Sequence, residues 1–357
     1  MGDNMRLIDL IVEFNLRSLA IIGLTKNVGK TVTMNKVLDQ AIKDGFRVGL
    51  ASMGRDGEKE DILTRQKKPK IEVQPGNLVV TAEDALKGSR ALLRPIVSTN
   101  IFTPLGEVFI YEVRRAGNVE LVGPRTQKQL KYVVELLTER TDLTLLDGAI
   151  NRVLSASPSV SDGTIVATGA SLSRSYNNIV RKTAFRLETL RLPPVEEKYL
   201  IERAEEELEH SRAVLLGEDG HWYSLESPTS FGLGPRLEAR LEEGIQKIFL
   251  GGALTDEILK AALNPAFLET GKIVIRDGTK VFTNPMLWKK FRSRGGRIEV
   301  LQKIRVVGLT VNPTAPEHYF FDPEELIGYL ASEIPDLPIL DVVAGIGWWG
   351  KEKLCLA

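Results

Sequence analysis

Cysteine is almost absent from this chain, which has 357 residues and a single cysteine, Cys355. A disulfide framework and a cluster of cysteine metal ligands within the chain are therefore excluded. The three histidines, His210, His221 and His318, show no ligand-like spacing, so a histidine zinc site is not expected either. So little cysteine is typical of proteins of the reducing cytoplasm, which is where we expect this one.

Net charge and long apolar runs are lacking as well. Lysine plus arginine and aspartate plus glutamate number 47 each, so the chain has no overall field that would attract nucleic acid or an anionic membrane. No apolar run approaches the roughly 20 residues of a membrane helix. Residues 1–19 alternate charged and apolar side chains, unlike the continuous apolar region of a signal peptide. We therefore expect neither nucleic acid nor a membrane among the partners.

What the chain does contain is a strand, a Gly-Lys-Thr turn and a helix in succession. Residues 19–22 form a continuous apolar run, which is typical of a buried parallel strand. After residue 31, apolar side chains recur at helical spacing. They are Met34, Val37, Leu38 and Ala41. This order of elements is the one in which a phosphate-binding P-loop is built.

The turn itself, residues 23–31, reads Gly-Leu-Thr-Lys-Asn-Val-Gly-Lys-Thr. Gly29 allows close approach of the backbone to phosphate, Lys30 can reach the β- and γ-phosphates, and the Thr31 hydroxyl can bind Mg²⁺. Five residues separate Gly23 from Gly29, whereas the common pattern has four. The alternative is a Gly-Lys-Thr that opens a helix by chance. The predicted contacts to ATP are Gly23, Thr25, Lys26, Asn27, Val28, Gly29, Lys30, Thr31 and Val32, with Asn312 added below.

Carboxylates follow two of the predicted strands. Asp147 comes directly after the apolar residues 143–146, as the metal-binding aspartate of a P-loop protein does. Asp56 and Glu58 lie in an acidic loop that follows the predicted strand 46–51. We predict Thr31, Asp147 and Asp56 as Mg²⁺ ligands, and Lys30, Asp147, Asp56 and Glu58 as the catalytic group, with the acidic loop as a switch. A turn-capping role for Asp147 and a merely solvated acidic loop are the alternatives.

Asn312 is the candidate for recognition of the base. It ends the apolar strand 305–311, and a side-chain amide can pair with both the donor and the acceptor edge of a purine. Turn formation together with Pro313 is the competing interpretation. The absence of a guanine-binding Asn/Thr-Lys-x-Asp motif at a strand end favours ATP, and GTP remains open.

Taken together, the pattern predicts an α/β fold with a doubly wound, mostly parallel sheet of P-loop type. A glutamate-rich stretch, residues 196–209, is interpreted as a solvated helix that marks a boundary. We predict a nucleotide-binding core of residues 1–195 plus 300–357, and an inserted or added α/β lobe of residues 196–299.

Residues 23–31 resemble the P-loop of dethiobiotin synthetase and its relatives, in which five residues also separate the glycines. Residues 308–312, followed by Pro316, look like the base-binding strand of that group, and residues 337–340 look like its closing strand. The chain departs from the synthetase at two positions that matter for its activity. Residues 50–52 contain no lysine to handle the diamine substrate, and residues 147–150 read Asp-Gly-Ala-Ile where the synthetase has Glu-Gly-Ala-Gly-Gly. The resemblance implies that nucleotide binding is retained and the substrate chemistry replaced.

Three segments, residues 23–31, 167–174 and 310–314, also resemble the reactivase subunit that accompanies adenosylcobalamin-dependent lysine aminomutases. That family implies an ATP-driven, chaperone-like factor that exchanges damaged cofactor on a partner enzyme. The partners would be the aminomutase or a second reactivase subunit. The resemblance to this P-loop class also implies that the chain forms a homodimer. An ATP-dependent small-molecule ligase or kinase and a non-catalytic nucleotide-binding module are the two rival hypotheses.

Overall fold

The computed structural model describes residues 4–54, 70–148, 153–225, 232–349 and 352–356. The chain divides into two compact units, Met1–Arg186 with Arg305–Ala357, and Leu187–Ile304. Helix α4 (Tyr176–Leu190) contains the first junction. Among the described residues, no helix is both long enough and apolar enough to cross a membrane.

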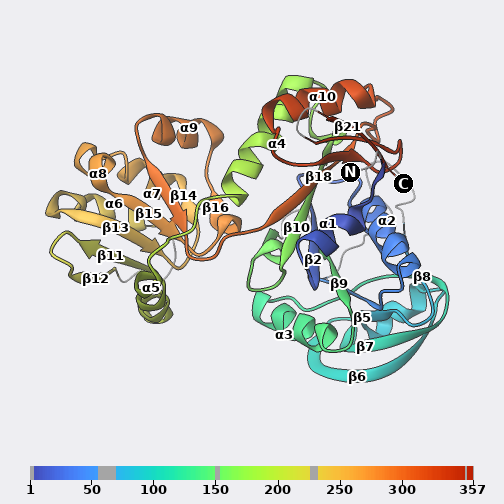
Figure 1. Ribbon diagram of the computed structural model, residues 1–357. Coiled ribbons are helices and arrows are strands. Elements are labelled where there is room, and N and C mark those ends of the chain that lie inside the picture. The colour runs from blue at the N-terminus through green and yellow to red at the C-terminus, as the bar shows by residue number, and fades with distance from the viewer. Residues whose placement is uncertain (1–3, 55–69, 149–152, 226–231, 350–351, 357) are drawn as a thin grey trace. The chain divides into compact units, whose positions relative to one another are not determined.

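The first unit is built on a 12-stranded sheet in the order β1-β21-β20-β19-β18-β10-β2-β9-β3-β5-β7-β6. Every neighbouring pair from β19 to β5 is parallel, and the pairs β5–β7, β7–β6, β19–β20 and β20–β21 are antiparallel. Figure 1 shows β10, β2 and β9 side by side. The mixed α/β fold with a large, mostly parallel central sheet is confirmed. The elements of this unit are β1 (Asn4–Met5), α1 (Leu7–Glu13), β2 (Ser18–Gly23), α2 (Lys30–Lys43), β3 (Val48–Ser52), β4 (Ile71–Val73), β5 (Leu78–Ala82), β6 (Leu92–Thr103), β7 (Gly106–Arg115), β8 (Gly117–Val119), α3 (Gln127–Thr138), β9 (Leu143–Gly148), β10 (Gly163–Gly169), β18 (Val306–Asn312), α10 (Pro323–Glu333), β19 (Ile339–Asp341), β20 (Ile346–Trp349) and β21 (Glu352–Leu356).

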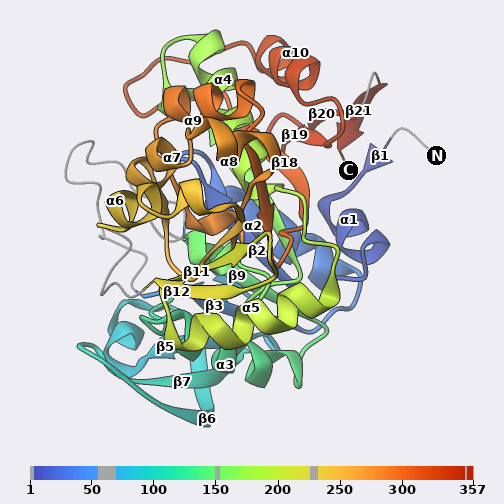
Figure 2. The same ribbon diagram turned by 90° about the vertical axis from the view of Figure 1, so that its left-hand side faces the viewer.

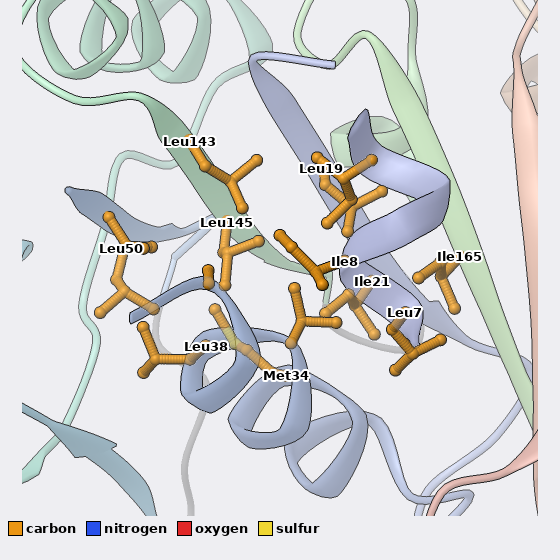
Figure 3. Packing of buried hydrophobic residues seen from close by; sticks show 14 of the residues in the cluster. Leu7, Ile8, Leu19, Ile21, Met34, Leu38, Leu50, Leu143, Leu145 and Ile165 are labelled. Atoms are coloured by element: carbon orange, nitrogen blue, oxygen red, sulfur yellow. The ribbon is translucent and has the colours of Figure 1, made fainter. Parts of the chain in front are cut away.

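The main core lies between this sheet and the helix pair α1 and α2. Alternate residues of each strand point to one face of a sheet, so Leu19 and Ile21 of β2 share a face with Leu143 and Leu145 of β9. Figure 3 shows these side chains directed toward Met34 of α2 and toward the labelled leucine and isoleucine of α1. All of them are almost fully buried. The apolar face of α2 is thereby fixed against β2 and β9, which sets the position at which α2 begins.

The opposite face of the sheet is covered by α3. This helix begins after Thr126, whose side-chain oxygen accepts a hydrogen bond from the Gln129 N–H as an N-cap. Its Leu137 packs so closely on β3 that a Cβ at Gly49 would lie 3.2 Å from Leu137 Cδ2. A parallel sheet covered on both faces explains why β2, β3, β9 and β10 are buried along their whole length.

The second unit has its own five-stranded sheet in the order β12-β11-β13-β15-β17, in which β13, β15 and β17 are parallel. Figure 2 shows α5 lying along β11, where Leu200, Ala204 and Leu208 face the sheet. Trp222 and Phe249 stack in the same core with ring centroids 5.0 Å apart. The elements are α5 (Lys198–His210), β11 (Ala213–Gly217), β12 (Trp222–Leu225), α6 (Leu233–Glu238), β13 (Ile245–Leu250), β14 (Leu254–Thr255), α7 (Asp256–Ala261), α8 (Pro265–Thr270), β15 (Lys272–Ile275), β16 (Val281–Phe282), α9 (Pro285–Ser293) and β17 (Arg297–Val300).

Candidate functional site

The loop between β2 and α2 is held in a specific backbone conformation. Gly29 is the N-cap of α2 with φ 86° and ψ 13°, a left-handed conformation that glycine adopts without steric cost. Asn27 has φ 61°, which asparagine tolerates better than most residues. The Leu24 N–H donates to the Ala167 carbonyl oxygen of β10 at 2.9 Å, and the Thr33 N–H donates to the Gly29 oxygen at 2.9 Å. The loop is thus fixed at both ends and turned in the middle.

Lys30, the first residue of α2, points back toward the end of β9. Its Nζ donates a hydrogen bond to the Gly148 carbonyl oxygen at 2.8 Å and lies 3.7 Å from Asp147 Oδ1. The side chains of Lys30 and Asp147 are only 10 % and 5 % exposed. A buried charge is tolerated when it is paired and hydrogen-bonded, so each of the two groups compensates the other.

Gly23 makes room for the Lys30 side chain. A Cβ at Gly23 would lie 2.8 Å from Lys30 Cδ, 2.9 Å from Lys30 Cγ and 2.8 Å from Val28 Cγ2. Such distances are well inside the usual carbon–carbon separation of about 3.5–4.0 Å. Glycine at the end of β2 is therefore required for the aliphatic stem of Lys30 to reach the end of β9.

Asp147 sits at the carboxyl end of β9, between two parallel neighbours. It pairs with Ile21 of β2 on one side and with Ser52 of β3 on the other. Carboxyl ends of parallel strands meet at one edge of a sheet, which is where ligands bind in open α/β folds. Within the described residues, no group of three or more histidine, cysteine, aspartate or glutamate side chains is placed to hold a metal. The described residues could therefore add only ligands of other kinds to a cation at Asp147, such as a hydroxyl, beside water or phosphate oxygens.

Asn312, at the end of β18, contacts the same loop. Its Nδ2 donates to the Asn27 carbonyl oxygen at 2.8 Å, and its Oδ1 accepts from the Thr314 N–H at 3.1 Å. Ser171 Oγ donates to the same Asn27 oxygen at 3.4 Å. The loop between β2 and α2 is therefore held from β18 and from the segment after β10.

Aromatic side chains fix the segment that follows Asn312. The Tyr319 hydroxyl donates to the Ala170 carbonyl oxygen at 2.6 Å, and the Arg174 guanidinium carbon lies 4.9 Å from the centre of the Tyr319 ring. Burial, reinforced by the negative charge of Glu317, raises the pKa of the Tyr319 hydroxyl above its ordinary value. The hydroxyl therefore stays protonated, and remains a donor, at neutral pH.

The structure brings Lys30, Asp147 and Asn312 together around residues 23–32. Within the loop, Val28 is buried, Lys26 is exposed, and Thr25, Asn27, Thr31 and Val32 are half-buried. Asp56 and Glu58 lie outside the described residues.

Two hydrogen bonds of this region were not predicted from the sequence. They involve the Gly148 carbonyl, which accepts from Lys30, and Ser171, which donates to the Asn27 carbonyl. A carbonyl has no sequence signature. Ser171 follows β10, and only the adjacency of β10 and β2 in the sheet brings it to the loop.

Comparison with known proteins adds nothing to the fold described above. No family model matches the chain, and no curated protein matches it. Among solved structures, the BceF tyrosine kinase domain is similar at a TM-score of 0.26 and 16 % sequence identity. The match covers 49 % of this chain and 66 % of the kinase domain, just under two thirds of its length. A likeness this weak carries no conclusion about function, and the resemblances to dethiobiotin synthetase and to the reactivase subunit stay predictions.

Proposed function

We propose that this chain is a Mg²⁺-dependent P-loop protein that binds and hydrolyses ATP. One observation carries the proposal: a buried lysine at the start of α2 meets a buried aspartate at the end of the neighbouring strand, beside a loop with left-handed residues. The first-turn N–H groups of any α-helix lack intrahelical acceptors, and with the helix dipole they form an anion site. In this chain that turn consists of Lys30, Thr31 and Val32.

The residues at the site fit a magnesium nucleotide. Thr31 and Asp147 offer hydroxyl and carboxylate oxygens, which are the ligand types that Mg²⁺ accepts. When bound, Mg²⁺ would supply neutralisation of the phosphate charge. Lys30 would then turn its ammonium group from the Gly148 carbonyl to phosphate oxygens, and the loop backbone would surround the phosphates. Asp56 and Glu58 remain predicted as the switch or water-positioning groups.

The same proposal includes a protein partner. It is supported by the resemblance of residues 167–174 and 310–314 to the reactivase subunit, and the partner would be a cobalamin-dependent aminomutase or a second reactivase subunit. Hydrolysis would then drive remodelling of that enzyme. A metabolite substrate received as in a ligase or kinase, and a loop that binds nucleotide without turnover, are the alternatives that the experiment separates.

The test is Mg²⁺-dependent phosphate release from ATP and GTP by the purified chain and by Lys30→Ala. Lys43→Ala is the matched control, because Lys43 lies in the last turn of the same helix and forms an exposed pair with Asp39. We expect release that persists in Lys43→Ala and disappears in Lys30→Ala. The preference between ATP and GTP would identify the base.

Other results of the same experiment would indicate one of the alternative functions. Release that appears only with an added metabolite indicates a ligase or kinase. Nucleotide binding without release, with or without candidate partners, indicates a non-catalytic module. Equal release by Lys30→Ala and the unmodified chain would refute the site.

A further inference from the structure

The amide of Asn312 is oriented by the protein's own backbone. The Thr314 N–H can only donate and the Asn27 carbonyl can only accept, so Oδ1 must face Thr314 and Nδ2 must face Asn27. The two contacts, at 3.1 Å and 2.8 Å, fix both ends of the amide group. An asparagine held in this way is directed at the loop and not primarily at a base.

Asn312 is also enclosed by close backbone approaches. It pairs with Gly169 across the β10–β18 ladder, and a Cβ at Gly169 would lie 2.0 Å from the Asn312 carbonyl oxygen. A Cβ at Gly29 would lie 3.4 Å from Asn312 Cβ. Glycine at position 169 therefore lets the end of β18 lie directly against the end of β10, while the start of α2 lies within ordinary contact distance of Asn312. The Asn312 side chain thus reaches Asn27 from a closely packed stretch of backbone.

The residue that receives this contact has a costly backbone conformation. Asn27 has φ 61°, and left-handed backbone at a non-glycine residue persists when its surroundings hold it. The contact from Asn312 Nδ2, assisted at 3.4 Å by Ser171 Oγ, holds the carbonyl of that very residue. Asn27 lies three positions before Lys30, in the middle of the loop that would surround the phosphates.

We propose that Asn312 is a positioning residue for the phosphate loop, acting through the Asn27 carbonyl on the triphosphate of any nucleotide and not on the base. This inference rests on the proposed nucleotide-binding function. It replaces base reading by Asn312 with a role in keeping the loop in the binding conformation.

The size of the effect follows from the contact. A hydrogen bond of this kind contributes about 0.5–1.5 kcal/mol, which corresponds to a change of about 2- to 13-fold in an equilibrium. When fewer molecules hold the loop in the binding conformation, the apparent affinity falls by the same fraction. We therefore expect a loss of up to about tenfold in affinity, equal for every ligand that carries the triphosphate.

The experiment measures dissociation constants by calorimetry for MgATP, MgGTP and magnesium tripolyphosphate, which has no base. Asn312→Ala removes both amide contacts. Asn312→Ser keeps an acceptor for the Thr314 N–H, because serine forms the equivalent turn, and removes the amide donor. Asn178→Ala, whose amide accepts from Arg181 at 3.0 Å on α4, is the control. Melting temperatures establish that each variant is folded.

We expect both Asn312 variants to weaken all three ligands by the same factor, with Asn178→Ala unchanged. A change in the ratio of ATP to GTP affinity with tripolyphosphate unaffected would mean that Asn312 reads the base, and would overturn the inference. Unchanged affinity for all three ligands would overturn it as well. If the unmodified chain binds none of the three, the proposed function itself fails, which is a separate result.

Discussion

Replacement of Gly23 by alanine tests the geometry of the site most directly. The added Cβ would lie 2.8 Å from Lys30 Cδ and 2.8 Å from Val28 Cγ2. Val28 is 2 % exposed and β-branched, so it has little freedom to move aside. The Lys30 stem must therefore shift, which breaks or lengthens its hydrogen bond to the Gly148 carbonyl.

The magnitude combines two effects. Overpacking of a buried position costs about 1–3 kcal/mol, and a hydrogen bond from a charged donor contributes about 1.5–3 kcal/mol. Because the Lys30 stem can relieve part of the overlap by giving up that bond, the two costs overlap. We expect a loss of about 2–3 kcal/mol in the free energy of unfolding. MgATP affinity should fall at least about tenfold, since Lys30 is the proposed phosphate ligand.

Urea unfolding measures the loss of stability and calorimetry measures the MgATP affinity, with Gly328→Ala as the matched control. Gly328 lies inside α10, and a Cβ there would meet nothing within 4 Å. The same substitution at that position should stabilise the chain by about 0.5–1 kcal/mol, because alanine is the better helix former. A Gly23→Ala variant as stable as the unmodified chain, with unchanged MgATP affinity, would refute the steric argument.

Two further predictions concern neighbouring groups. Asp147→Ala should lower the free energy of unfolding by about 3 kcal/mol, which is the lower end for a broken buried pair, because Gly148 still accepts from Lys30. ATP binding without Mg²⁺ should become tighter, because the substitution removes a negative charge. Calorimetry that shows an unchanged Mg²⁺ dependence of ATP binding would contradict the role of Asp147. Because the pKa of Tyr319 is raised in the folded state, its contribution to stability is present below the ordinary tyrosine pKa of about 10 and is lost as pH rises through the folded value. Tyr319→Phe should therefore flatten the decline of stability above about pH 10, and an identical alkaline unfolding profile would oppose that assignment.

Local patterns were enough to predict several parts of this fold. The apolar strand 19–22, the loop and the helical spacing after residue 31 correspond to β2, the loop and α2, because each depends on residues adjacent in sequence. Asp147 was predicted at a strand end and lies at one. Strand β6 was not predicted, because it is an exposed edge strand with Pro95 and three irregularities in its pairing, so it lacks the alternation of a half-buried strand.

The sequence by itself determined the α/β class and the strand, loop and helix that place Lys30 at the start of α2, since each depends on a short run of residues. Tertiary structure alone decided which groups meet that loop. The Gly148 carbonyl is 118 positions from Lys30, and Asn312 is 285 positions from the Asn27 carbonyl that it holds. Contacts over such separations depend on the order β18-β10-β2-β9 in the sheet, which no local pattern of side chains encodes.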